Sequence, residues 1–165
     1  MWLPSFVTCS SASATEHSTV CGVWKLDQVA YVVRDMGASL PAYQALFGPF
    51  EVAEYPLEAV RCRGRDIDCR LKVATNNDGP IEIEIIEVME GHTPHSEHIE
   101  SHGEGLHHVR FRVDDIDGRI AKMESGGYET VFYKRISSEI AFAYMEAQGA
   151  QGQGGRVIEL LEMPA

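Results

Sequence analysis

The chain has 165 residues, 44% of them apolar, which is enough to bury the core of one compact domain without disulfide staples. Its formal net charge of −11 argues against nucleic acid or an anionic membrane surface as a partner, because phosphate contacts need a basic face. The sequence contains no apolar run near the roughly 20 residues of a membrane span and no signal-peptide pattern, so we expect a cytoplasmic protein.

Residues 1–22 are rich in Ser, Thr and Ala without any period, and we expect a mobile N-terminal extension. The first structured module is expected over residues 23–91. An alternating strand over residues 26–33 leads through Asp35 into a helix over residues 38–47, which Gly48-Pro49 ends. Three more strands follow in this module, over residues 51–55, 68–74 and 81–88.

The second module, over residues 105–165, repeats this plan. It has a strand over residues 107–113, a helix over residues 117–124 and strands over residues 129–133, 140–146 and 156–163. The modules are joined by a histidine-rich linker, residues 92–104, which we expect to be solvated because no carboxylate or Cys pattern completes a metal site. The glycine-rich stretch at residues 148–155 is interpreted as a connector that could cover a site at the following strand.

An internal repeat supports this division into two modules. The segment LDQVAYVVRDM (26–36) matches LHHVRFRVDDI (106–116), and IEIIEV (83–88) matches IELLEM (158–163). The offsets are similar, as expected for two copies of one β-α-β-β-β unit joined by a short linker.

Polar residues occupy equivalent places in these otherwise apolar strands. Gln28 corresponds to His108, and Glu84 corresponds to Glu159. A carboxylate among Ile, Val and Leu is costly to bury unless it is paired or bound to a cation. The four residues therefore predict a metal site between the two halves.

The neighbours of His108 have to be assigned to a face of the strand. Because side chains alternate along a strand, His107, which matches Asp27, is expected to face away from the site. Arg110 and Arg112 are expected to lean the same way as His108. Two interpretations of these arginines remain open. They form an internal salt bridge to Glu82 or Glu84, or they contact an anionic group of a substrate, such as a carboxylate or a CoA phosphate.

The phrases LDQVAYVV, GEGLHHVRFRVDDID and GRVIELLE resemble the vicinal oxygen chelate superfamily, and the resemblance covers about residues 24–163. It implies an α+β fold in which two tandem βαβββ modules form a cupped, barrel-like mixed sheet. It also implies that Gln28, Glu84, His108 and Glu159 bind one divalent metal ion: zinc, nickel, cobalt, manganese or magnesium. The exposed strand edges of such a cup predict a homodimer.

Within this superfamily the set of four ligands resembles that of glyoxalase I, and the ligand pattern of methylmalonyl-CoA epimerase is also similar. The resemblance therefore implies an isomerase or lyase that moves a proton next to a carbonyl of a small, anionic acid or thioester, with Glu159 and Glu84 as the proton-transfer residues. An extradiol-type dioxygenase is the first alternative, disfavoured because Gln28 breaks the two-His-one-carboxylate pattern. The second is a non-catalytic small-molecule binder of the bleomycin-resistance type, disfavoured by the inward carboxylates.

Overall fold

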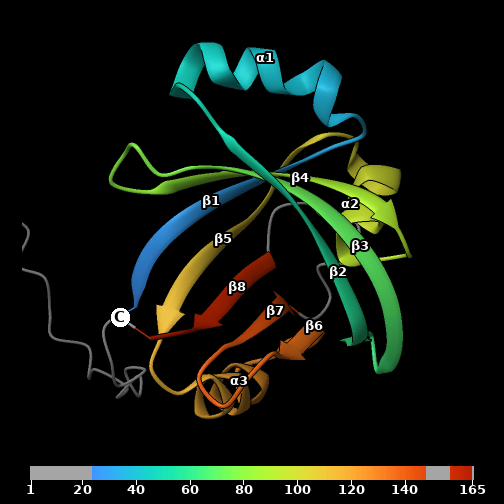
Figure 1. Cartoon of the computed structure of the whole chain (residues 1–165). Helices are drawn as coiled ribbons and strands as arrows, with labels where there is room; N and C mark the ends of the chain where they lie inside the picture. The colour runs from blue at the N-terminus through green and yellow to red at the C-terminus, as the bar shows by residue number, and fades with distance from the viewer. Residues whose placement is uncertain (1–23, 148–156, 165) are drawn as a thin grey trace, which may run out of the picture.

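The computed structural model describes residues 24–147 and 157–164, so the predicted N-terminal extension and the glycine-rich connector lie outside the described residues. Eight strands and three helices are found in the described part (Figure 1). In chain order they are β1 (Lys25–Val33), α1 (Met36–Phe47), β2 (Glu51–Cys62), β3 (Arg65–Asn76), β4 (Glu82–Glu90), α2 (Pro94–His102), β5 (Gly105–Val113), α3 (Ile116–Ser125), β6 (Tyr128–Arg135), β7 (Ala141–Ala147) and β8 (Val157–Glu162).

The same β-α-β-β-β plan appears in both halves, as the repeat predicts. Each long helix begins at an aspartate whose carboxylate accepts a hydrogen bond from a first-turn backbone N–H, Asp35 from Ala38 and Asp115 from Gly118, both at 3.0 Å. Strands β2 and β3 are longer than expected. A tight turn joins them at Arg63 and Gly64, whose φ values of 44° and 78° suit a two-residue hairpin loop.

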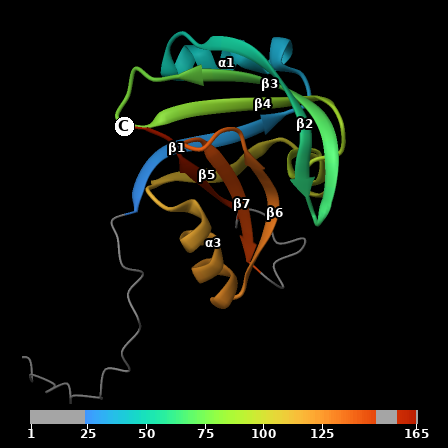
Figure 2. The same cartoon turned by 60° about the horizontal axis from the view of Figure 1, so that its bottom comes forward.

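The strands form one closed mixed barrel in the order β1-β4-β3-β2-β6-β7-β8-β5 (Figures 1 and 2). The equivalent strands β1 and β5 run antiparallel side by side, and each pairs in parallel with the last strand of its own module. This is the barrel-like α+β sheet expected for two pseudo-symmetric modules. The barrel closes between β2 and β6 through two residue pairs, Arg61 with Tyr133 and Cys62 with Phe132.

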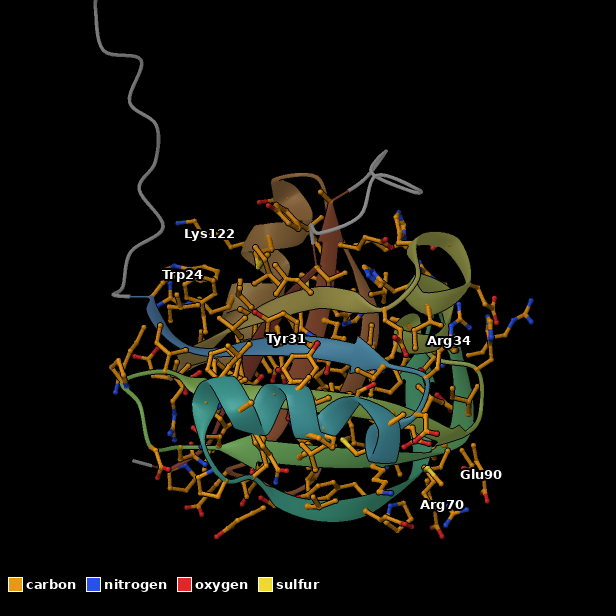
Figure 3. The ribbon with its side chains drawn as sticks, turned by 90° about the horizontal axis from the view of Figure 1, so that it is seen from above. Trp24, Tyr31, Arg34, Arg70, Glu90 and Lys122 are labelled. Atoms are coloured by element: carbon orange, nitrogen blue, oxygen red, sulfur yellow. The ribbon has the colours of Figure 1, made fainter. Side chains whose placement is uncertain are left out.

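Helices α1 and α3 cover the outer surface of the barrel at opposite ends of the view in Figure 1. Beneath α1 the cluster includes Val33, Met36 and Ile85, and Tyr31 of β1 meets Tyr43 of the helix with ring centroids 5.3 Å apart (Figure 3). A similar cluster lies beneath α3. Because these outward residues alternate with inward ones, burying them also fixes which side chains point into the barrel.

A second glutamate of each repeat holds the helices in place. Glu87 accepts a hydrogen bond from the backbone N–H of Met36 at 2.9 Å, and its counterpart Glu162 accepts one from Ile116 at 2.7 Å. A carboxylate at a helix N-terminus also opposes the positive end of the helix dipole. The motifs IEIIEV and IELLEM thus each contain one inward glutamate and one that anchors a helix.

The histidine-rich segment is a helix, α2, and the expectation of a fully solvated linker is wrong. Pro94 begins α2, and the buried Ile99 joins the cluster inside the barrel with Ala30 and Ile86. His95, one turn before Ile99, is fully buried. With three buried residues, Pro94, His95 and Ile99, in nine, this inner face is too short to stand out as a helical period.

Ion pairs and hydrogen bonds fasten α2 to the barrel. The guanidinium of Arg63 lies 2.6 Å from Glu97 of α2 and 3.0 Å from Glu146 of β7. At the other end Arg34, labelled in Figure 3, donates to the backbone carbonyl of Ile99 at 3.1 Å. Among the described residues, no helix is both long and apolar enough to cross a bilayer.

Candidate functional site

The barrel interior carries a group of polar side chains beside the two-fold related strands. Cross-strand partners in register share a face of the sheet. Gln28 of β1 lies opposite Glu82 of β4 and Arg110 of β5. Ala30 of β1 lies opposite Glu84 of β4 and His108 of β5. By the same rule the inward-facing polar residues include Gln28, Glu82, Glu84, His108, Arg110 and Glu159.

The imidazole of His108 lies between the two glutamates of the repeat. Its Nε2 atom is 3.1 Å from Oε2 of Glu159 and 3.8 Å from Oε2 of Glu84. Both carboxylates keep slight access to solvent, with 15% of the Glu84 side chain and 10% of the Glu159 side chain exposed. The structure therefore places these three predicted ligands at one point inside the barrel.

Gln28, the fourth predicted ligand, is fully buried beside this point. Its amide nitrogen donates to a carboxylate oxygen of Glu82. Its Oε1 atom has no hydrogen-bond partner among the residues that the structure describes. An unpaired buried amide oxygen is unfavourable by about 1–3 kcal/mol, and a cation among Gln28, Glu84, His108 and Glu159 would remove that cost.

The predicted ligand set therefore fits a divalent ion on its chemistry. One imidazole nitrogen, two carboxylates and one amide oxygen suit zinc or a harder divalent ion. The fit rests on the orphaned oxygen of Gln28 and on the convergence of His108 with two glutamates.

Two irregularities in the β1–β5 ladder shape the site. Register shifts lie between Leu26 and Gln28 and between Ala30 and Tyr31 of β1. At the second shift, Ala30 pairs with His108 whereas Tyr31 pairs with Leu106, so His107 is the extra residue of a β-bulge. At a bulge the alternation of faces is interrupted.

The bulge is why the expectation that His107 faces away is wrong. His107 is only 1% exposed, and its Nδ1 atom lies 2.9 Å from Nδ1 of His108. Its repeat partner Asp27 sits at the other bulge and turns to Arg110, whose Nε lies 2.9 Å from Asp27 Oδ1. In both halves, therefore, the bulge residue, Asp27 or His107, contacts a residue of the inner polar group.

A histidine cluster continues from His108 toward α2. His95 of α2 contacts Tyr144 of β7 through Nε2 at 3.1 Å and Thr93 through Nδ1 at 3.3 Å. The His95 and His107 ring centroids are 4.8 Å apart. Ligand atoms of His95, His107 and His108 all lie within 4.8 Å of one another. Sequence reasoning missed His95 and Tyr144, although the histidine run and the HH doublet were visible.

The two arginines form internal ion pairs. Arg110 bridges Asp27 at 2.9 Å and Glu82 at 3.3 Å, so the reading as an internal salt bridge describes its contacts. Arg112 lies 3.8 Å from Asp27 and donates to the carbonyl of Pro164 at 2.9 Å. Glu82, a residue the sequence pattern could not separate from solvent-exposed glutamates, is part of this inner network.

Burial dominates the electrostatics of the metal-free site. It raises the pKa of both Glu84 and Glu159, and the Glu84 carboxyl is raised further by the negative charge of Glu159. Arg110 opposes the rise at both carboxyls. Burial and the charge of Arg110 lower the pKa of His108 to about 3. The site without metal therefore favours neutral carboxyls and a neutral imidazole.

These shifts predict how the stability of the metal-free protein depends on pH. Because the pKa of Glu84 and Glu159 rises from 4.5 to about 8 on folding, the folded state binds more protons and loses stability as pH rises through this range. Burial lowers the pKa of His95, His107 and His108 from 6.5, which adds stability as pH rises toward 6.5. Above that pH the contribution of the carboxyls remains.

We expect the melting temperature of chelator-treated protein to fall between pH 6.5 and pH 8. Differential scanning calorimetry at a series of pH values measures this directly. Excess divalent metal is expected to reverse the trend, because metal binding requires deprotonated carboxylates. A rising melting temperature over the same interval in chelator would contradict the burial of two protonated carboxyls.

A separate apolar cavity lies outside the barrel between α3 and the sheet. It has a volume of about 350 Å³ and is lined mainly by apolar side chains, including Trp24, Phe111 and Met123. Figure 3 shows Trp24 at the start of β1, close to Lys122 of α3. Because Phe111 and Ile158 alternate with the inward residues of their strands, this cavity is on the opposite face from the carboxylates.

Solved structures with a similar fold include a hypothetical protein of Bacillus halodurans and two methylmalonyl-CoA epimerases. The first is 21% identical, with a TM-score of 0.62 over 87% of this chain and 97% of that one. The Mycobacterium tuberculosis epimerase is 17% identical, with a TM-score of 0.56 over 85% and 88%. A Streptomyces coelicolor epimerase in complex with 2-nitronate-propionyl-CoA is 18% identical, with a TM-score of 0.58 over 87% and 97%. These identities show the fold alone.

No curated protein sequence matches the chain. The sequence pattern of the Glyoxalase/Bleomycin resistance protein/Dioxygenase superfamily matches residues 27–144, which is more than half of the chain. That match covers both members of the doubled β1–β5 pair. Together with the doubled module and the inward polar residues, it shows that the chain belongs to this superfamily, the vicinal oxygen chelate superfamily.

Proposed function

We propose that the protein is a metal-dependent enzyme of the glyoxalase or epimerase type, moving a proton at the carbon next to the carbonyl of a small acid or thioester. The observation that carries the proposal is a pair of carboxyls from equivalent strands, Glu84 and Glu159, that both face Nε2 of one buried imidazole, that of His108. An isomerase of this kind needs one group to remove a proton and one to return it.

The electrostatics support acid–base work by these two residues. A general base is effective when its pKa lies near the working pH, and burial moves the pKa of both carboxyls in that direction. The positive charge of Arg110 stabilises the ionised form of both glutamates, so a carboxylate that can accept a proton can form inside the barrel. Two groups with matched surroundings can exchange the roles of acid and base.

Gln28, Glu84, His108 and Glu159 would hold the divalent ion. When bound, such an ion would supply positive charge at the substrate's carbonyl oxygen, which eases removal of the α-proton. His108 would bind it through Nε2 and Gln28 through Oε1. Either glutamate then accepts or delivers the proton at a carboxylate oxygen.

Solvent exchange tests the proposal. Metal-loaded protein is incubated in D₂O with methylmalonyl-CoA, and separately with the hemithioacetal of methylglyoxal and glutathione. We expect deuterium at the α-carbon of one of these substrates at a rate that chelator abolishes. Oxygen consumption without exchange would favour the dioxygenase alternative, whereas tight binding of a small molecule by metal-free protein without turnover would favour the binding protein.

Replacing Arg110 by alanine is expected to raise KM for an anionic substrate by roughly tenfold, with a smaller effect on kcat. A substrate anion would compete for Arg110 with Asp27 and Glu82, and a positioning contact of this kind is made equally in the ground and transition states. Steady-state kinetics measure both constants, with Arg61→Ala, an exposed arginine, as the control. A loss confined to kcat would place Arg110 in the chemistry instead.

The homodimer and the cytoplasmic location stay predictions. The dimer is supported by the free edge of β2, because residues 51–60 of this strand have no partner on β6 in the described ladder. Val52 and Tyr55 are exposed on that segment. An unpaired edge with exposed apolar residues favours pairing with another chain.

A further inference from the structure

The histidine cluster contains a chain of hydrogen bonds that ends at the predicted metal. It begins at the buried ring of His107. It continues from Nδ1 of His107 to Nδ1 of His108 at 2.9 Å. It ends where Nε2 of His108 meets Oε2 of Glu159 at 3.1 Å.

The direction of the hydrogen bond between the two rings follows from the other nitrogen of His108. Nε2 of His108 faces carboxyl oxygens of Glu159 and Glu84, where a bound ion would need its lone pair, so a neutral His108 ring carries its single proton on Nδ1. His107 is buried against three other histidine rings, where a positive charge would be unfavourable, and a neutral ring carries one N–H. Its Nδ1 therefore accepts, and the proton between the two rings belongs to Nδ1 of His108.

We infer that His107 is a positioning residue, which holds His108 in the tautomer protonated at Nδ1 and so leaves the Nε2 lone pair aimed at Glu84 and Glu159. The inference rests on the proposed function only for the identity of what binds there, a divalent ion. The partner of the non-ligating nitrogen commonly sets the tautomer of a metal-bound histidine. Here that partner is another histidine, which is brought to the inner face by the bulge.

A metal ion held by the three histidines themselves fits the distances less well. Two nitrogens bound tetrahedrally to one zinc ion lie about 3.3 Å apart, whereas the Nδ1 atoms of His107 and His108 are 2.9 Å apart, a hydrogen-bond distance. Both nitrogens of His95 already have partners in Thr93 and Tyr144. Hydrogen bonds thus account for all three rings.

Helix α2 supplies the wall that holds His107. The rings of His95 and His98 lie 4.8 Å and 5.1 Å from the His107 ring. Pro94 is buried at the first turn, fixed by the helix itself. The repeat predicts neither the bulge nor α2. Together these two features position His107 and so determine the tautomer of His108.

The first test reads the tautomer directly in metal-free protein. Long-range ¹H–¹⁵N NMR spectra distinguish a histidine protonated at Nδ1 from one protonated at Nε2. We expect the Nδ1–H form for His108 in the wild type, and a change toward the Nε2–H form in His107→Phe, which keeps a ring but has no acceptor. Finding His108 as Nε2–H in the wild type, or unchanged in His107→Phe, would overturn the inference.

The second test measures metal affinity by competition with a chromophoric chelator. His107→Phe is expected to weaken Zn²⁺ or Co²⁺ binding by about 10- to 100-fold, the range for loss of a hydrogen-bond partner of a ligand histidine. His107→Asn, whose amide oxygen can accept near the position of Nδ1, is expected to restore most of it. His98→Phe, on the same helix and beside the same ring, is the matched control with little change.

The outcomes separate this inference from the proposed function. The tautomer is measured without metal or substrate. Absence of α-proton exchange alone would therefore contradict the proposed enzyme activity but not the positioning role of His107. A His107→Phe affinity within twofold of the wild type would overturn the positioning role. So would a second metal equivalent that His95→Phe removes, because Nδ1 of His108 would then be a ligand.

Discussion

Glu159→Gln is expected to lower kcat for α-proton exchange by about 10²-fold or more, the size typical of a lost general acid–base group. Glutamine keeps the shape and an oxygen that can still face the metal but cannot take up the proton. Metal binding should therefore survive in part. Single-turnover deuterium incorporation, followed by mass spectrometry, measures the loss in the chemical step.

Glu90→Gln is the matched control, because Glu90 is an exposed glutamate that pairs with Arg70 on the outer surface (Figure 3). Its rate should stay within twofold of the wild type. Glu84→Gln completes the comparison: if one glutamate removes the α-proton and the other returns it, each single variant should lose interconversion in both directions while still exchanging deuterium at one configuration of the α-carbon. A Glu159→Gln enzyme with an unchanged exchange rate would remove this residue from the chemistry.

His108→Ala is expected to strip most of the metal from the protein. It removes the imidazole at the centre of the predicted ligand set, so the affinity should fall by more than the roughly 100-fold upper range for loss of a ligand's hydrogen-bond partner. Elemental analysis of protein purified without chelator or an affinity-tag metal gives the occupancy and the identity of the ion.

The control for this change is His102→Ala, a histidine on the exposed end of α2, which should keep the wild-type metal content. Circular dichroism establishes that His108→Ala is folded. Gln28→Ala provides an independent measure, since it removes the orphaned buried oxygen without touching the histidine cluster. Equal metal content in wild type, His108→Ala and Gln28→Ala would exclude this ligand set.

The fold and the inward residues could be predicted because the sequence contains the same strand pattern in two copies. Gln28 and His108 are equivalent, as are Glu84 and Glu159, and the alternation of strand side chains puts each pair on one face. The same motifs contain Glu87 and Glu162, but the pattern did not predict that these glutamates anchor the helices. A pattern with period two predicts a face reliably wherever the strand is regular.

The rest of the site depends on departures from regularity. The bulge at His107 adds one residue to the strand, and period-two reasoning assigns that residue to the wrong face. His95 was missed because its partners, Tyr144 and His107, lie far along the chain and meet it only when α2 packs against the barrel. Closure of the barrel likewise depends on the reach of β2 to Arg61 and Cys62, which no local signal in the sequence records.

The two-fold relation between the modules bears on the handedness of the substrate. Glu84 on β4 and Glu159 on β8 flank the central β1–β5 pair from opposite sides, so by themselves they treat mirror-image α-carbons alike. Ala30 and Arg110 hold equivalent positions in the two halves, one small and apolar, the other large and cationic. If the protein has the proposed activity, its preference for one configuration of the substrate is set by the residues that differ between the halves.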